Sequence, residues 1–285
     1  MKELAVQSFA KINISLNITE KRSDGYHELD MVMVPIKLHD TIHISKLPSG
    51  VDNYVTIDDF SVAPIKYNLA TFAIDCLAAK YKFSDKFRIT IHKNIPMQAG
   101  LGGGSSNAAF TLHAVNKMLK LNISDEELIE LSKKLGADVP FFIKCKPARC
   151  RGIGDVMEPI NIKNNYYCLI VKPNQGCSTV DVYNAADSMT LKTGNIDDVV
   201  RALETGDDEL LEKSIFNVLE EPAITIVPEI KNLIELLKFK GFKIVQMSGS
   251  GSAVFALSTD AKFVKKVTHE LEDNDFFVEM TQVLK

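Results

Sequence analysis

Alternation between apolar and polar side chains predicts strands in the first third of the chain. The alternation is clearest over residues 12–18 and 87–92, where an apolar residue occupies every second position. A period of two is typical of a half-buried strand, and we expect the first of these strands to cover residues 4–18. Apolar runs around residues 32–36 and 41–44 predict two further strands.

The first strand carries two polar residues, Lys11 and Asn13, on a single face. Because successive side chains of a strand point to opposite faces, both lie opposite the apolar positions that follow Lys11. Taken by itself, this pattern favours an edge strand with a solvated polar face.

Apolar residues at helical spacing predict helices over residues 68–81 and 124–135. Asn68 precedes the first helix and is a natural N-cap. The second helix starts with Ser124 and Glu127 in capping-box spacing and is expected to stop at Gly136.

The second half of the chain alternates between strand and helix patterns after a polar stretch near residues 160–165. Strands are expected at residues 166–171, 243–247, 253–257 and 277–283. Helices are expected at residues 180–186, 197–203, 209–217, 228–237 and 261–271. This order is close to a βαββαβ unit, with an antiparallel sheet and helices on one of its faces.

Residues 96–109 form a glycine-rich stretch between a predicted strand and a predicted helix. They read Pro-Met-Gln-Ala-Gly-Leu-Gly-Gly-Gly-Ser-Ser-Asn-Ala-Ala. Glycine permits positive φ and close approach to a ligand, and the first amides of a helix attract anions. The stretch therefore predicts a phosphate-binding loop, with the hydroxyls of Ser105 and Ser106 available to phosphate or to its metal. A tight turn without a ligand is the simpler alternative.

The two common phosphate loops do not fit this stretch. A Walker A loop requires a lysine after the glycines, and none follows Gly104. A dinucleotide-binding fingerprint that starts at Gly100 requires a third glycine where Ser105 stands.

Composition narrows the class of protein. The chain has 285 residues, enough for two domains or one large domain, with 33 basic and 37 acidic side chains. Because no run of Lys and Arg stands out, polyanion binding is not expected as a main function. Five cysteines without a Cys-x-x-Cys pair indicate reduced thiols in a cytosol, most of them in the core, and the six histidines show no metal-ligand spacing. With no signal peptide and no apolar run of membrane length, we expect a cytoplasmic protein.

Three other stretches combine turn chemistry with reactive side chains. In residues 22–28 a Ser-Asp-Gly turn precedes Tyr26 and His27, which either restart a strand or offer a stacking face and a polar edge to a base. Asp138 lies between a helix end and an apolar run, where capping of the next turn is the simpler interpretation. Residues 248–252, Ser-Gly-Ser-Gly-Ser, suit a hairpin turn.

In their order along the chain, these motifs resemble those of the GHMP small-molecule kinases, and the resemblance covers essentially the whole chain. The matching segments are Ala-Lys-Ile-Asn at residues 10–13, Arg-x-Asp-Gly-Tyr-His-Glu at 22–28, the glycine-rich loop, Gly-Ala-Asp-Val-Pro-Phe-Phe at 136–142 and Met-Ser-Gly-Ser-Gly-Ser-Ala-Val-Phe at 247–255. The family's Gly-x-Gly-Glu stands here as Gly-Ile-Gly-Asp, with Asp155 in place of glutamate.

The resemblance implies a mixed α/β (α+β) fold with the two domains of a GHMP kinase. Residues 1–160 would form an N-terminal, ribosomal S5-like domain that binds ATP. Residues 161–285 would form a C-terminal, ferredoxin-like βαββαβ domain.

The resemblance also implies roles for individual residues. Lys11 and Asp138 would be catalytic, with Asp138 as the acid/base and Lys11 at the hydroxyl that is phosphorylated. Substrate would be bound by Asn13, Tyr26, His27, Thr179 and Tyr183, the two tyrosine rings lying on either side of a cytosine; a core-facing helical position is the alternative for Tyr183. ATP would be bound by Asn68, Lys93, Pro96, Gly100, Leu101, Gly102, Gly103, Gly104, Ser105, Ser106 and Asn107, with Ser105 or Ser106 as a magnesium contact.

Residues 22–28 resemble the pyrimidine-binding segment of one branch of the family. The implied reaction is ATP- and Mg²⁺-dependent phosphorylation of the 2-hydroxyl of a cytidyl diphosphate methylerythritol in non-mevalonate isoprenoid precursor biosynthesis. The alternatives are a GHMP kinase for another small alcohol, such as mevalonate or homoserine, and a non-catalytic nucleotide-binding protein, which would be expected to lack Lys11 or Asp138. We expect this small molecule as the partner, without nucleic acid or membrane, and a monomer or weak homodimer.

Overall fold

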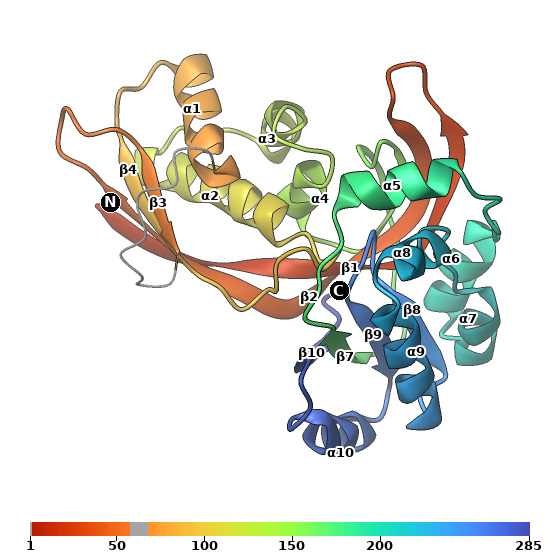
Figure 1. The fold of residues 1–285 in the computed structure, drawn as a ribbon. Coiled ribbons are helices and arrows are strands. Elements are labelled where there is room, and N and C mark those ends of the chain that lie inside the picture. Colours follow the sequence, from red (N-terminus) through yellow and green to blue (C-terminus); the bar gives the residue numbers. More distant parts are fainter. Residues whose placement is uncertain (1, 58–67) are drawn as a thin grey trace. The chain divides into compact units, whose positions relative to one another are not determined.

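The computed structural model describes residues 2–57 and 68–285, which form two compact units interleaved along the sequence. The first unit comprises Met1–Ala10, His39–Ile95 and Gly102–Cys145; the second comprises Lys11–Leu38, Pro96–Leu101 and Lys146–Lys285. The paired long strands β1 (Glu3–Lys21) and β2 (His27–Lys46) therefore contribute to both units (Figure 1). The boundary predicted near residue 160 falls inside the second unit and stays a prediction.

The first unit packs helices against part of a sheet. Strand β4 (Phe87–His92) lies parallel to β3 (Tyr54–Ile57) and antiparallel to the C-terminal part of β2, where Thr41 faces His92. The helices are α1 (Leu69–Tyr81), α2 (Gly103–Leu119), α3 (Asp125–Ser132) and α4 (Val139–Lys144). Helix α2 packs against α1 and α4 (Figure 1). The alternation predicted for β4 is confirmed, since its phenylalanine and two isoleucines are buried.

Two strands were predicted where the structure has the single strand β2. The apolar pattern breaks at residues 37–40, Lys-Leu-His-Asp, yet the strand continues through them. Their polar groups find partners in the fold: the exposed Lys37 donates to Gln282 at 2.6 Å, and the buried Asp40 accepts backbone amides from the loop after β4. Polar residues in a strand interior can thus interrupt the sequence pattern without interrupting the ladder.

Two predicted caps of helices in the first unit are confirmed. The Asn68 side chain accepts the amide of Ala70 at 2.9 Å at the start of α1. Ser124 and Glu127 form the reciprocal bonds of a capping box at the start of α3. Helix α3 ends at Ser132, earlier than predicted, and the chain continues to residue 135 as a turn.

The second unit contains the predicted βαββαβ arrangement. Its strands are β7 (Tyr167–Lys172), β8 (Ile244–Met247), β9 (Val254–Ser258) and β10 (Phe277–Gln282), in the antiparallel order β10-β7-β9-β8. Helices α9 (Glu229–Phe239) and α10 (Ala261–Leu271) complete the unit (Figure 1). The N-terminal part of β2 pairs with β5 (Ala148–Gly152), which pairs with β6 (Val156–Pro159).

Four helices lie between β7 and α9 along the chain: α5 (Thr179–Asp187), α6 (Ile196–Thr205), α7 (Asp208–Ser214) and α8 (Glu220–Ile226). The pattern did not predict α8, and it extended α7 to residue 217. The chain leaves α7 earlier because residues 216–218 pair with β1. Leu16 donates its amide to Phe216 at 3.1 Å and accepts the amide of Val218 at 3.0 Å.

The cysteines are free thiols, as the sequence predicts, and three of them are buried. Burial raises the pKa of Cys177 to about 11, so that its thiol stays protonated at neutral pH. These are properties of small core residues rather than of nucleophiles.

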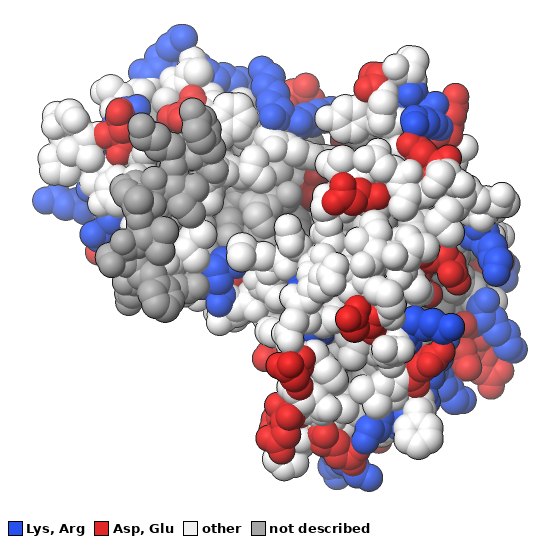
Figure 2. Space-filling model, viewed as in Figure 1, with Lys and Arg blue, Asp and Glu red and all other residues white. Residues whose placement is uncertain are grey.

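The surface shown in Figure 2 carries Lys and Arg side chains interspersed with Asp and Glu. This distribution agrees with the nearly equal totals of 33 basic and 37 acidic residues. In the described part of the chain, no helix is both long and apolar enough to cross a membrane.

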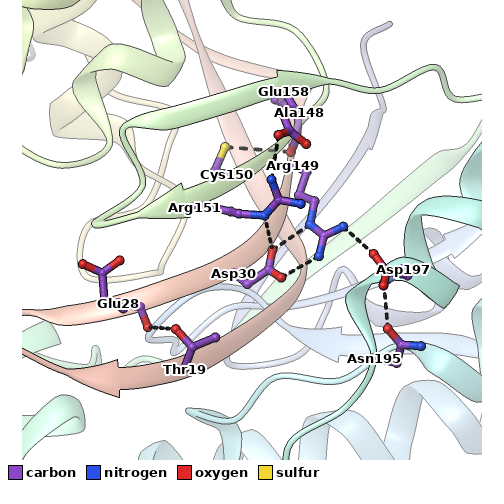
Figure 3. Close-up of polar contacts among 10 residues, drawn as sticks. All are labelled: Thr19, Glu28, Asp30, Ala148, Arg149, Cys150, Arg151, Glu158, Asn195 and Asp197. Carbon is purple, nitrogen blue, oxygen red and sulfur yellow. Dashed lines mark hydrogen bonds and ion pairs between the residues drawn. The ribbon is translucent and has the colours of Figure 1, made fainter.

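An ion network fastens α6 to strands β5 and β2. Figure 3 shows the guanidinium of Arg149, on β5, lying between Asp30 of β2 and Asp197 of α6. Arg149 donates to both carboxylate oxygens of Asp30, at 2.8 and 2.6 Å, and to Asp197 at 2.5 Å. These bonds raise the pKa of Arg149. A partly buried, bidentate pair of this kind is stronger than an exposed ion pair.

Replacing Arg149 with methionine is expected to lower the free energy of unfolding by about 1–3 kcal/mol, because Asp30 would keep its charge without its main partner. Urea denaturation measures the change. The control is Arg201→Met, since the ion pair of Arg201 is with Asp198 on its own helix, and a change within about 0.5 kcal/mol is expected there. Equal losses in the two variants would contradict a role for the network.

Candidate functional site

Lys11 and Asn13 lie side by side in the second unit, as the period of two predicts. The Lys11 ammonium donates to Asn13 Oδ1 at 2.5 Å and to the carbonyl oxygen of Gly100 at 2.8 Å. The alternative of a solvated polar face is wrong, since Lys11 is 3% and Asn13 2% exposed. A buried ammonium is stable only where polar atoms surround it, and the chain supplies two of them here.

The hairpin between β8 and β9 closes over this pair. Ser248 Oγ accepts the backbone amide of Asn13 at 3.2 Å, and Asn13 Nδ2 contacts Met31 Sδ at 3.2 Å. Gly249 has φ +56°, and a Cβ there would lie 3.2 Å from Lys11 Nζ. The hairpin therefore needs a glycine at this point, in a conformation that L-residues rarely adopt.

Asn217 holds that hairpin from the other side, and the sequence analysis gave it no role. Its Nδ2 donates to the carbonyl oxygens of Met247 at 2.9 Å and Gly249 at 2.8 Å. Its Oδ1 accepts the amide of Leu219 at 3.0 Å. Asn217 lies 30 residues before Met247 and outside the predicted motifs, so spacing could not reveal its bonds to the hairpin.

The first half of the glycine-rich loop is bound firmly to the second unit. Each carbonyl oxygen of residues 98–101 accepts at least one hydrogen bond there, at 2.8 to 3.2 Å. The donors are the backbone amides of Lys11, Cys177, Ser252 and Ala253, the ammonium of Lys11 and the hydroxyl of Ser248. Leu101 is buried and anchors the end of this segment. The loop backbone is therefore fixed before any ligand binds.

The second half of the loop begins α2 in the first unit. Gly102 occupies the N-cap with φ +71°, and no side chain in the described part of the chain caps this helix. Gly103 and Gly104 are helical, so positive φ occurs at Gly100 and Gly102 rather than at all four glycines. An uncapped helix start of this length presents amide donors suited to an anion.

The Lys93 ammonium lies beside this helix start. A Cβ on Gly103 would be 3.2 Å from Lys93 Nζ. An ammonium group and the first amides of a helix both attract an anion. This placement therefore fits the predicted contact of Lys93 with a nucleotide phosphate.

Asp40 holds Lys93 in place, and sequence reasoning missed it. Its carboxylate accepts the Lys93 ammonium at 2.5 Å and the amides of Asn94 and Ile95 at 2.9 Å each. Asp40 is fully buried, so these three donors replace its hydration. In the sequence Asp40 is a single acidic residue within an apolar strand, and this pattern does not indicate that Lys93 is its partner.

Two residues predicted to contact ATP use their side chains inside the first unit. Ser106 Oγ donates to the carbonyl oxygen of Phe9 at 2.6 Å, and Asn107 Oδ1 accepts the hydroxyl of Ser8 at 2.5 Å. Both residues are buried. Of the two serines considered for magnesium, the half-buried Ser105 is therefore the better candidate. Pro96, half-buried at the start of the loop, shows no comparable polar contact among the described residues.

The residues predicted to bind a pyrimidine lie in the second unit. Tyr26 follows the predicted turn, and 60% of it is exposed. The His27 ring lies 5.0 Å from the ring of Tyr183, at an interplanar angle of 30°. Thr179 Oγ1 is 3.0 Å from Ser250 Oγ in the glycine hairpin. Tyr183 is half-buried against His27 rather than in the core.

Asp138 begins α4 in the first unit. It occupies the N-cap position, with Pro140 in the first turn, but its carboxylate makes no capping bond. The simpler interpretation of Asp138, as a cap for the next turn, is therefore wrong. Its role in catalysis stays a prediction.

The chain matches known proteins along most of its length. The models of the GHMP kinase N-terminal and C-terminal domains match residues 68–146 and 199–275. The chain is 37% identical over 271 residues to 4-diphosphocytidyl-2-C-methyl-D-erythritol kinase of Lachnoclostridium phytofermentans, covering 95% of this chain and 93% of that protein. The enzyme of the same name from Geobacillus kaustophilus is 36% identical over 280 residues, 97% of both chains.

The chain belongs to the family of 4-diphosphocytidyl-2-C-methyl-D-erythritol kinases. A crystal structure of 4-(cytidine 5'-diphospho)-2C-methyl-D-erythritol kinase matches with a TM-score of 0.81 at 28% identity, over 99% of this chain and 100% of that chain. A homoserine kinase from Cytophaga hutchinsonii shares the fold, with a TM-score of 0.75 at 16% identity over 98% of this chain and 94% of that chain. The predicted resemblance to GHMP kinases and the predicted fold class are confirmed.

Proposed function

We propose that the protein transfers the γ-phosphoryl group of ATP to the 2-hydroxyl of 4-diphosphocytidyl-2-C-methyl-D-erythritol, a step of non-mevalonate isoprenoid precursor biosynthesis. One observation carries the proposal: the Lys11 ammonium bonds both Asn13 and the backbone of Gly100 in the glycine-rich loop. A single cation thus links the residues expected at the acceptor hydroxyl with the loop expected at the phosphates. The names of relatives 36–37% identical to the chain support the substrate.

The reaction needs positioning and charge stabilisation more than covalent chemistry. Asp138 would accept the proton of the 2-hydroxyl, and Lys11 would stabilise the developing alkoxide. Asn13 would orient the acceptor. The bond between the γ-phosphorus and its bridging oxygen breaks as the substrate oxygen bonds to phosphorus, which gives the 2-phosphate and ADP.

The nucleotide phosphates would be held by the amides at the start of α2 and by the Lys93 ammonium. Asp40 fixes Lys93 so that its ammonium lies against Gly103, where the helix begins. Mg²⁺ bound with ATP would neutralise developing charge on the phosphates, and Ser105 is the candidate for a protein contact.

Tyr26→Ala is expected to raise the KM for the cytidyl substrate by about tenfold while leaving the KM for ATP unchanged, because a stacking contact with a base is worth about 1–3 kcal/mol. Because the ring is exposed, a loss of core packing does not explain such a rise in KM. Steady-state kinetics with each substrate varied in turn measure both constants. Equal rises in the two KM values would show that the ring supports the fold instead.

A coupled ADP-release assay tests the proposed function. Purified protein, ATP and Mg²⁺ are combined with 4-diphosphocytidyl-2-C-methyl-D-erythritol, mevalonate or homoserine. We expect turnover with the cytidyl substrate alone. Turnover with another alcohol would overturn the proposed substrate, and tight ATP binding without turnover on any of the three would favour a non-catalytic nucleotide-binding protein.

A further inference from the structure

Three residues on one face of α5 contact both segments that surround the predicted pyrimidine site. Thr179, Tyr183 and Asp187 are spaced by four, so they share a face of the helix. Thr179 meets Ser250 of the glycine hairpin, while Tyr183 and Asp187 meet His27 at the start of β2. Helix α5 therefore connects the glycine hairpin to the turn between β1 and β2.

Asp187 binds two cationic or potentially cationic side chains. Its Oδ1 lies 2.8 Å from His27 Nε2, and its Oδ2 lies 2.6 Å from Lys21 Nζ. The imidazole is held on two sides, by this carboxylate and by the Tyr183 ring, and only 9% of the His27 side chain is exposed. Its orientation is therefore set by α5 rather than by solvent.

The chemistry of the carboxylate determines which ring nitrogen carries the proton. Hydrogen bonds from Lys21 and then from His27 lower the pKa of Asp187, which is therefore ionised at neutral pH. An ionised carboxylate only accepts hydrogen bonds. His27 Nε2 must then carry a proton and donate it to Asp187, and in the neutral ring Nδ1 is left as an acceptor.

We propose that Asp187 is a positioning residue for the pyrimidine: it fixes the His27 ring with its proton on Nε2 and so presents Nδ1 to the base. This inference rests on the proposed function, because it assigns His27 to the cytidine part of the substrate. Nδ1 as an acceptor matches the exocyclic amino donor of cytosine, where uracil carries an acceptor oxygen. Asp187 thus acts on pyrimidine recognition through His27 and touches neither the phosphates nor the acceptor hydroxyl.

Asp187→Asn tests this role. Asparagine keeps the size of the side chain but can donate to His27 Nε2, so the ring is no longer confined to one tautomer. We expect the KM for the cytidyl substrate to rise about tenfold, with kcat and the KM for ATP within about twofold of the wild-type values. The matched control is Asp181→Asn on the same helix, which removes the same charge from an exposed position and should leave all three constants unchanged.

Lys21→Met separates hydrogen bonding from charge. It removes the second partner of Asp187 but keeps the bond to His27, so we expect a rise in KM for the cytidyl substrate smaller than that of Asp187→Asn. An equal or larger rise would overturn the proposal, because the lysine and not the histidine would then explain the effect of Asp187.

Nitrogen NMR measures the tautomer of the His27 ring, which would not change if Asp187 only stabilised the fold. In ¹⁵N-labelled protein the ring signals of His27 are assigned by their loss in His27→Gln. They should show a protonated Nε2 in the wild-type and Asp181→Asn proteins. In Asp187→Asn they should show a mixture of tautomers. Unchanged tautomers in Asp187→Asn, or an unchanged KM, would overturn the proposal. If the wild-type protein turned over none of the alcohols, the proposed function would fail. The role of Asp187 could then still be tested by measuring the binding of cytidine monophosphate through the same His27 ring signals.

Discussion

Asp138→Asn is expected to lower kcat by about 10²–10⁴ while changing the KM for ATP by less than about threefold. The amide keeps the shape of the side chain but cannot accept the proton of the acceptor hydroxyl, and general-base catalysis contributes a factor of this size. The Asp138 carboxylate does not cap α4, so the substitution removes no capping bond from that helix. Initial rates in the ADP-release assay measure the change.

The control for this variant is Asp125→Asn, which makes the same change in the first turn of α3. Its kcat should equal that of the wild-type protein. Urea denaturation of both variants separates a chemical effect from a loss of folded protein. A kcat for Asp138→Asn near the wild-type value would remove this carboxylate from the mechanism.

Local chemistry made several elements predictable from the sequence. The strands β1 and β4 show their period of two directly in the order of their residues, and the capping box of α3 joins residues three positions apart. The predicted bounds of α10 are identical to the observed ones, because its apolar stripe and its N-cap, Asp260, agree. In each case propensity, pattern and capping point to the same structure.

Burial of polar groups was not predictable, because it depends on partners far away in the chain. The sequence pattern treats Lys11 as solvated, but Gly100, 89 residues later, supplies its acceptor. It likewise gives no reason to single out Asp40, whose donors follow β4, 53 to 55 residues later. The pattern of apolar positions indicates which side chains avoid water. It does not indicate which polar atoms replace water as the hydrogen-bond partners of buried polar groups.

Spacing within a helix could have revealed one residue that was missed. Asp187 follows Tyr183 by four positions, so a helix that presents one to a base presents the other beside it. Its partner His27 begins strand β2, however, and the two residues are brought together only by the fold. A similar limit applied to the two serines of the loop, which are equivalent in the sequence. The structure separates them because only Ser106 bonds the backbone of Phe9.

Gly100→Ala is expected to lower the free energy of unfolding by about 2–4 kcal/mol and kcat/KM by about 10² or more. Gly100 has φ +71°, and a Cβ there would lie 1.9 Å from the carbonyl oxygen of Ser248. Since the atoms that this Cβ would meet belong to the backbone of Ser248 and Gly251, the loop must move away from the glycine hairpin. This movement adds overpacking to the strain of a left-handed residue. The movement would also break the bond from Lys11 to Gly100, and displacements of about 1 Å near reacting groups reduce rates by this factor.

Gly104→Ala provides a contrast within the same loop, because Gly104 is helical and a Cβ there meets nothing within 4 Å. Alanine at a helical position with free space should leave the stability unchanged or raise it by up to about 1 kcal/mol. The two glycine-to-alanine variants should therefore shift the urea midpoint in opposite directions or by very different amounts. Similar shifts in both would show that the loop does not depend on close packing of Gly100 against Ser248, and the rigid loop inferred from its bonded carbonyls would have to be abandoned.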